Sequence, residues 1–127
     1  MTPSQIIAAD HQRFGHDAED TKRLMQAIVT MVNKHMATLV QNGDSLLLLT
    51  MIAPKTAELS FFTAETSPQK IKSAIQYFIG QVKKSGVTKV YGQDGGPVLN
   101  KTLELLKSLG VNVEKSDKHQ FLWMAKV

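Results

Sequence analysis

The second half of the chain contains one pattern twice: an amphipathic helix, a glycine that ends it, and a strand directly afterwards. The first copy covers residues 67–91 and stops its helix at Gly86, and the second covers residues 97–113 and stops its helix at Gly110. Helix–glycine–strand units laid end to end pack as layers of helices on a sheet. In such folds ligands tend to bind where strands end near helix N-termini. The pattern therefore predicts a layered α/β fold.

The length and composition suit one domain with one hydrophobic core. The chain has 127 residues, of which 43% are hydrophobic, and we expect a single domain over residues 1–127. Within it we expect a helical N-terminal part, residues 1–43, and a sheet-and-helix core, residues 44–127. The longest apolar run, residues 46–49, is far shorter than the roughly 20 residues of a membrane helix. We therefore expect a cytoplasmic protein with no membrane partner.

Cysteine and charge content exclude some functions and leave others open. There is no cysteine, which excludes disulfides, zinc–thiolate sites and thiol nucleophiles. The net charge of +4 would favour an acidic partner such as a nucleotide or nucleic acid, but lysines on solvated helix faces explain it equally well. Arginine occurs only at positions 13 and 23, which weakens a nucleic-acid reading.

Two helices are predicted before the first strand. Thr2 and Pro3 form a helix-start signal, and Gly15 ends that helix. A second helix is predicted over residues 17–42, because apolar residues recur at spacings of three and four and the pair 42–43 is Asn-Gly. This apolar stripe consists of Leu24, Ile28, Met31, Val32, His35, Met36 and Leu39. Its place in the stripe predicts that His35 is a partly buried histidine and not a ligand.

The rest of the chain predicts a mixed, largely antiparallel sheet flanked by helices. The nearly continuous apolar run of residues 45–52 indicates a strand covered on both faces, and the short turn at residues 53–56 makes it a hairpin with the next strand. Ser67 and Pro68 begin the helix of the first repeated pattern. That helix must form one parallel β-α-β crossover if its flanking strands share a sheet. The predicted strands cover residues 45–52, 57–64, 87–92, 111–115 and 120–127, and the later helices cover residues 67–85 and 97–109.

One segment of the second pattern resembles a known enzyme family. Residues 103–111, Leu-Glu-Leu-Leu-Lys-Ser-Leu-Gly-Val, resemble the helix ending in Tyr-Glu-Lys-Leu-Gly-Phe of the GCN5-related N-acetyltransferases, the GNAT family. A second match covers residues 57–86, where the family has its long strand and the helix that receives coenzyme A. The resemblance extends over residues 45–127 and implies a GNAT-like fold. Because members of the family use acetyl-CoA as the acyl donor, the resemblance would also imply this donor for the present chain.

The chain departs from the family at the cofactor loop. The family cradles the CoA pyrophosphate on a loop of pattern Arg/Gln-x-x-Gly-x-Gly/Ala, and residues 67–72 read Ser-Pro-Gln-Lys-Ile-Lys. Lysines replace both glycines, and Pro68 lacks a backbone N–H donor. If CoA binds here, the resemblance implies contacts from Gln69, Lys70 and Lys72 by a different arrangement. The other interpretation is that these lysines are solvated helix residues.

The chain also departs from the family at the catalytic positions. Many family members protonate the departing thiolate with a tyrosine, and Leu106 stands at that position, with no proton to give. The family's frequent asparagine falls at Leu99, with Asn100 adjacent but turned away around the helix. We therefore predict no catalytic residue from the sequence.

Three other features are candidates for a site. His11 and His16, with acidic neighbours, offer metal-ligand types near Gly15, but a polar surface turn is the preferred interpretation and no metal site is predicted. The loop of residues 92–96, Gly-Gln-Asp-Gly-Gly, joins a strand to a helix and is either a ligand loop or a tight turn. Trp123 is either core or half of an oligomer surface.

Three functions follow from these observations. The leading hypothesis is a degenerate GNAT-like domain without a cofactor that acts as a structural or protein-interaction module with its own or other subunits. Small proteins of this kind resemble GNAT-like proteins of tailed bacteriophages, which would place it in a virion or in host cytoplasm. The alternative is an active acyl-CoA-dependent N-acetyltransferase with atypical cofactor contacts. The third is a nucleic-acid-binding module that uses the basic surface.

Overall fold

The structure, a computed structural model, describes the backbone of residues 1–93 and 97–127 and the side chains of residues 1–93 and 103–127. Its elements follow the order α1 (Pro3–Arg13), α2 (Ala18–Asn33), β1 (Ala37–Asn42), β2 (Ser45–Ala53), β3 (Thr56–Thr63), α3 (Pro68–Lys84), β4 (Lys89–Gly92), α4 (Pro97–Ser108), β5 (Asn112–Lys115) and β6 (Trp123–Lys126). Within these described residues no helix is long and apolar enough to cross a membrane.

The six strands form one sheet in the order β1-β2-β3-β4-β6-β5. Every neighbouring pair is antiparallel except β3 and β4, which are parallel and are joined through α3. The prediction of a mixed, largely antiparallel sheet with one parallel crossover is therefore confirmed.

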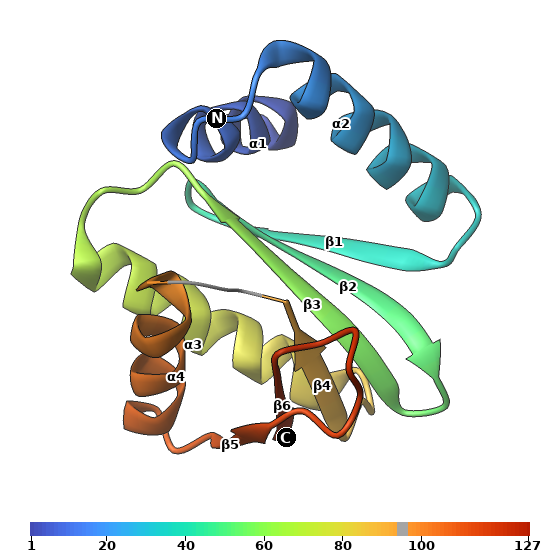
Figure 1. Cartoon of the computed structure of the whole chain (residues 1–127), viewed down its shortest axis with the longest axis vertical. Helices are drawn as coiled ribbons and strands as arrows, with labels where there is room; N and C mark the ends of the chain where they lie inside the picture. Colours follow the sequence, from blue (N-terminus) through green and yellow to red (C-terminus); the bar gives the residue numbers. More distant parts are fainter. Residues whose placement is uncertain (94–96) are drawn as a thin grey trace.

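Helices cover the two faces of the sheet in separate pairs, with α1 and α2 on one face and α3 and α4 on the other (Figure 1). The strand β2 supplies both faces, because its side chains alternate. Leu46 and Leu48 pack in a cluster with Ile6, Ile7 and Ile28 of α1 and α2. Leu47 and Leu49 pack in the other cluster, which also contains side chains of α3, β4 and β6. This alternation confirms that the apolar run is a strand buried on both faces.

The predicted span of the second helix is wrong. The helix α2 ends at Asn33, and His35 takes a left-handed conformation with φ of 58°. The chain then enters β1, which pairs with β2 from Ala37 to Asn42. His35 is consequently exposed in the connection and is not in an apolar stripe. The N-terminal helical part thus ends at Asn33, well before residue 43. The first strand of the sheet, β1, lies within the span that was predicted to be helical.

The helix boundaries around the repeated pattern are as predicted. The N-cap Ser67 accepts a hydrogen bond from the Lys70 backbone N–H, and Pro68 takes the first helical position. Gly86 and Gly110 follow their helices with φ of 84° and 80°, values that glycine adopts without a steric penalty. Both glycines therefore act as helix stops.

Candidate functional site

The parallel strands β3 and β4 separate soon after they meet. They pair over three residues only, from Thr56 opposite Lys89 to Glu58 opposite Tyr91. The strand β3 then continues to Thr63, toward α1, while β4 ends at Gly92 (Figure 1). Five residues at about 3.3 Å each give β3 an extension of about 16 Å beyond the last pair. The sheet is therefore open along this length.

A cavity of ≈ 970 Å³ occupies this opening. One wall is the extended part of β3, and the opposite wall is formed by Val90 of β4 and Trp123 of β6. Apolar residues of α3 such as Ile71 and Phe78 line it on one face of the sheet, and α1 and the turn after it line it near Phe14. A volume of this size, mostly apolar with a few polar groups, is typical of a small-molecule site.

The edge of β3 presents backbone hydrogen-bonding groups to this opening. Ala64 donates its backbone N–H to Asp44 O on the β2 side at 2.9 Å, whereas Thr63 donates its N–H to Asp10 Oδ1 at 3.1 Å. Successive residues of a strand direct their backbone groups to opposite sides. Phe61, two residues before Thr63, therefore turns its N–H and C=O toward the opening. A ligand with amide groups is suited to pair with this edge.

Glu58 lies at the point where the two strands part. It lines the cavity, and burial raises the pKa of its carboxyl above the ordinary value. A raised pKa makes a carboxylate a stronger base, which suits it to accept a proton in general acid–base chemistry. Sequence reading missed Glu58 because a single glutamate in a strand looks like a solvent-facing residue.

Trp123 and Gly92 lie opposite one another on neighbouring strands at the closed end of the opening. A Cβ on Gly92 would come within 2.1–2.3 Å of three indole atoms, including Nε1, so the ring lies directly against this glycine. Trp123 is buried, which confirms that it is a core residue. Its Nε1–H is buried and has no hydrogen-bond partner among the described residues.

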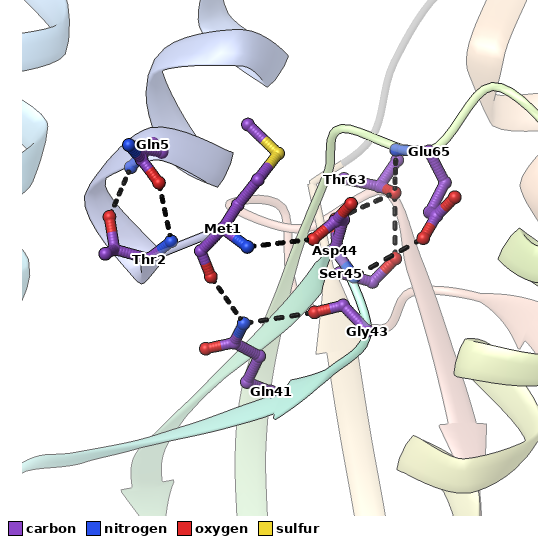
Figure 2. Close-up of polar contacts among 9 residues, drawn as sticks. All are labelled: Met1, Thr2, Gln5, Gln41, Gly43, Asp44, Ser45, Thr63 and Glu65. Carbon is purple, nitrogen blue, oxygen red and sulfur yellow. Dashed lines mark hydrogen bonds and ion pairs between the residues drawn. The ribbon is translucent and has the colours of Figure 1, made fainter.

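A polar network fixes the far end of β3 (Figure 2). The Thr63 hydroxyl donates to Asp44 O at 3.4 Å and accepts from the Glu65 backbone N–H at 3.0 Å. The buried Ser45 hydroxyl lies 2.8 Å from Thr63 Oγ1, and either hydroxyl can donate in this pair. Asp10 adds its bond to the Thr63 N–H from α1. The network thereby anchors the loop that leads from β3 to α3.

The two N-terminal histidines, His11 and His16, line the same cavity. Their rings stack with centroids 4.3 Å apart, and His11 Nδ1 lies 3.1 Å from Thr21 Oγ1. His16 lies 4.0 Å from an Asp20 carboxylate oxygen. No group of three or more potential metal ligands occurs in the described part of the chain.

The predicted cofactor residues lie beside the main cavity and not among the residues that line it. Gln69, Lys70 and Lys72 are all exposed near the start of α3. Gln69 and Lys70 border a smaller hollow of ≈ 390 Å³ next to the β1–β2 turn. Ile71, between the two lysines, does line the main cavity.

Of the positions that carry catalytic residues in the GNAT family, the structure describes the side chain of one, Leu106. Leu106 of α4 lines the main cavity, so the position that carries tyrosine in the family faces the site, but here it offers only a hydrocarbon side chain. The side chains of Leu99 and Asn100 lie outside the described residues, as do residues 94–96 of the glycine-rich loop. Gln93, just before them, lines the cavity and donates from Nε2 to Gln120 O at 3.0 Å.

Solved acetyltransferase structures share this arrangement. The microcin C7 self-immunity acetyltransferase MccE, in complex with acetyl-CoA and AMP, aligns with a TM-score of 0.62 over 98% of this chain and 83% of its own, at 12% identity. The ribosomal L7/L12 alpha-N-protein acetyltransferase RimL, in complex with coenzyme A, aligns with a TM-score of 0.60 over 98% and 85%, also at 12% identity. The IAA acetyltransferase from Bacillus cereus ATCC 14579 gives 0.55 over 80% and 84%, at 16% identity.

These likenesses establish the fold: the chain has the architecture of the GNAT acetyltransferases. No sequence-family profile and no curated protein matches the chain.

Proposed function

We propose that the protein is an acyl-CoA-dependent N-acyltransferase whose cofactor contacts differ from those of the family. The observation that carries the proposal is the opening between β3 and β4 with its ≈ 970 Å³ cavity. A seam paired along its whole length would have no room for the donor. The structural neighbours described above, two of them in complex with acetyl-CoA or CoA, support the same proposal.

The pantetheine arm of CoA fits the exposed edge of β3 chemically. This arm contains two amides in an extended chain and therefore offers the same groups as a short strand. Laid along residues 59–63, it would take the place of the missing β4 partner and pair with the backbone of Phe61. Its apolar segments would contact the apolar walls, which include Ile71 and Phe78.

The phosphate end of CoA would lie at the start of α3. The helix N-terminus carries partial positive charge, and Lys70 and Lys72 add two ammonium groups on either side of Ile71. Lysine side chains would thus replace the glycine-rich backbone cradle. This arrangement predicts a strong dependence of binding on ionic strength, because both lysines are exposed to solvent.

The reaction follows from the positions of the remaining groups. The acceptor amine attacks the thioester carbonyl carbon, the C–N bond forms, and the C–S bond breaks to release CoA as its thiolate. Glu58, at the closed end of the opening, accepts the proton that the amine loses. Leu106 has no proton to donate, so the thiolate takes its proton from solvent.

Titration calorimetry with acetyl-CoA tests the proposal. We expect binding that K70A/K72A weakens about tenfold at low salt, since two exposed charge contacts together are worth about 1.4 kcal/mol. The matched control is K83A/K84A at the other end of the same helix, where both lysines are also exposed. Equal weakening in the two double variants would refute the assignment of the phosphate end.

The second candidate is a GNAT-like scaffold that has lost its chemistry and acts as an interaction module, for instance as a subunit of a phage particle. It is favoured by the lysines in place of the loop glycines and by Leu106. Under this hypothesis neither acetyl-CoA nor CoA would bind, even at millimolar concentration. An absence of heat for both ligands would therefore overturn the proposed enzyme function in favour of the scaffold.

A further inference from the structure

Trp123 carries a buried hydrogen-bond donor in the cavity wall that the proposed reaction has not used. Trp123 is 4% exposed and lines the cavity. Its Nε1–H has no acceptor among the described residues. Buried donors are normally paired, and because the ring borders the cavity, a molecule bound there can supply the acceptor.

The position of the indole identifies which part of that molecule is near. Trp123 pairs with Gly92, one residue beyond the last paired position of β4, Tyr91. The closed end of the opening is therefore at Gly92, and β3 extends about 16 Å beyond its last paired residue to Thr63, where the loop to α3 begins. A CoA arm that enters from the start of α3 brings its thioester to this closed end.

Gly92 is what allows the indole to lie there. Any larger residue at position 92 would place its Cβ within 2.1–2.3 Å of the ring, at Cε2, Cζ2 and Nε1. The ring would have to move away from the strand, and its N–H would move with it. The position of the Trp123 N–H therefore depends on Gly92, because the absence of a side chain at position 92 leaves room for the indole ring.

We propose that Trp123 Nε1–H donates a hydrogen bond to the thioester carbonyl oxygen of the bound acyl-CoA. This assignment rests on the proposed acyltransferase function. The carbonyl oxygen gains negative charge when the amine attacks the carbon, so a fixed donor in a water-poor site stabilises the transition state more than the ground state. Trp123 is then a catalytic residue of the reaction.

The chain contains one tryptophan, so its indole N–H gives a single, unambiguous NMR resonance. We expect acetyl-CoA to shift this proton downfield, as formation of a hydrogen bond does. S-ethyl-CoA, a thioether that lacks only the carbonyl oxygen, is the matched control and should leave the resonance close to its position in the unliganded protein. Equal shifts with the two ligands would overturn the assignment.

Replacement of the one tryptophan by β-(3-benzothienyl)alanine tests the catalytic role. This residue keeps the shape of the ring and replaces N–H by sulfur. We expect kcat for acetyl transfer to fall by about 100-fold with KM nearly unchanged, the effect typical of a lost oxyanion donor. An unchanged kcat, or a loss confined to KM, would refute the catalytic role.

Calorimetry on the same samples separates this assignment from the proposed function. If acetyl-CoA does not bind, the acyltransferase function fails and the assignment fails with it. If acetyl-CoA binds and is turned over while acetyl-CoA and S-ethyl-CoA shift the indole resonance equally, only the role of Trp123 is overturned.

G92A supplies an independent variant. It should retain acetyl-CoA binding and lose the carbonyl-dependent shift of the indole resonance, because the added Cβ displaces the ring. An unaltered shift would contradict the geometry.

Discussion

Replacing Thr63 by valine should destabilise the protein by about 2–4 kcal/mol, although the two side chains have the same shape. In the structure the Thr63 hydroxyl is the hydrogen-bond partner of two groups, the buried Ser45 hydroxyl and the Glu65 backbone N–H. The substitution leaves both groups without this partner, at about 1–3 kcal/mol for the buried Ser45 hydroxyl and about 1 kcal/mol for the part-buried Glu65 N–H. Asp44 O loses little, because it still accepts from the Ala64 N–H at 2.9 Å.

A double-mutant cycle with S45A sharpens this prediction. S45A alone should cost only about 1 kcal/mol, because Thr63 keeps its bonds to Asp44 and Glu65. The double variant should be less destabilised than the sum of the two, since removal of the Ser45 hydroxyl also removes one of the groups that T63V leaves unpaired. Urea denaturation followed by circular dichroism measures the three free energies of unfolding. A T63V variant within 0.5 kcal/mol of the parent protein, or strictly additive effects, would refute the reasoning.

Two further predictions concern titratable groups. Because burial raises the pKa of Glu58, the folded state binds its proton more tightly than the unfolded state does, so the stability contribution of this group should fall as pH rises from its ordinary pKa through the raised one. E58Q should abolish this decline in denaturation experiments across that pH range, and an identical pH profile for the variant would contradict it. The Tyr91 hydroxyl, which donates to Asp117 at 2.7 Å, lowers the pKa of that carboxyl, and Lys89 lowers it further. In Y91F the Asp117 pKa measured by NMR titration should rise, and the small acid loss of stability linked to it should move to higher pH; an unmoved pKa would show that the hydroxyl has no such effect.

Much of the fold was predictable because its local signals agree with its packing. The proline–N-cap pairs, the two glycine helix stops and the apolar run of β2 each specify one local structure, and together they specify the layers. The prediction failed for β1, where apolar spacings of three and four continue from α2 through Met36 and Leu39. The break at His35 has no glycine, although its φ of 58° is one that glycine favours, and so gives no sequence signal. The pair Asn42-Gly43 predicts a helix end, whereas in the structure the left-handed Gly43 lies in the turn from β1 to β2.

The candidate site was less predictable for a physical reason. An opening in a sheet depends on how far two strands from distant parts of the sequence remain paired, and the residues of β3 look the same whether β4 accompanies them or not. Glu58 acquires its raised pKa from burial that only the assembled fold creates. The unpaired donor of Trp123 likewise depends on what surrounds the ring and not on the ring itself. The sequence did identify that Leu106 takes the family's tyrosine position, and this residue does face the cavity.

The three-residue ladder between β3 and β4 also has a consequence for the folding units of the molecule. It is the one strand-to-strand contact that joins β1–β3, with α1 and α2 packed on them, to the group β4, β6 and β5 within the described sheet. Two such groups, each with its own antiparallel pairs, are expected to open as separate cooperative units in native-state hydrogen exchange. A ligand bound along β3 and against β6 would bridge the two units. A ligand in the opening would then slow amide exchange in both groups of strands. With the ligand bound, the two groups would open together as one cooperative unit.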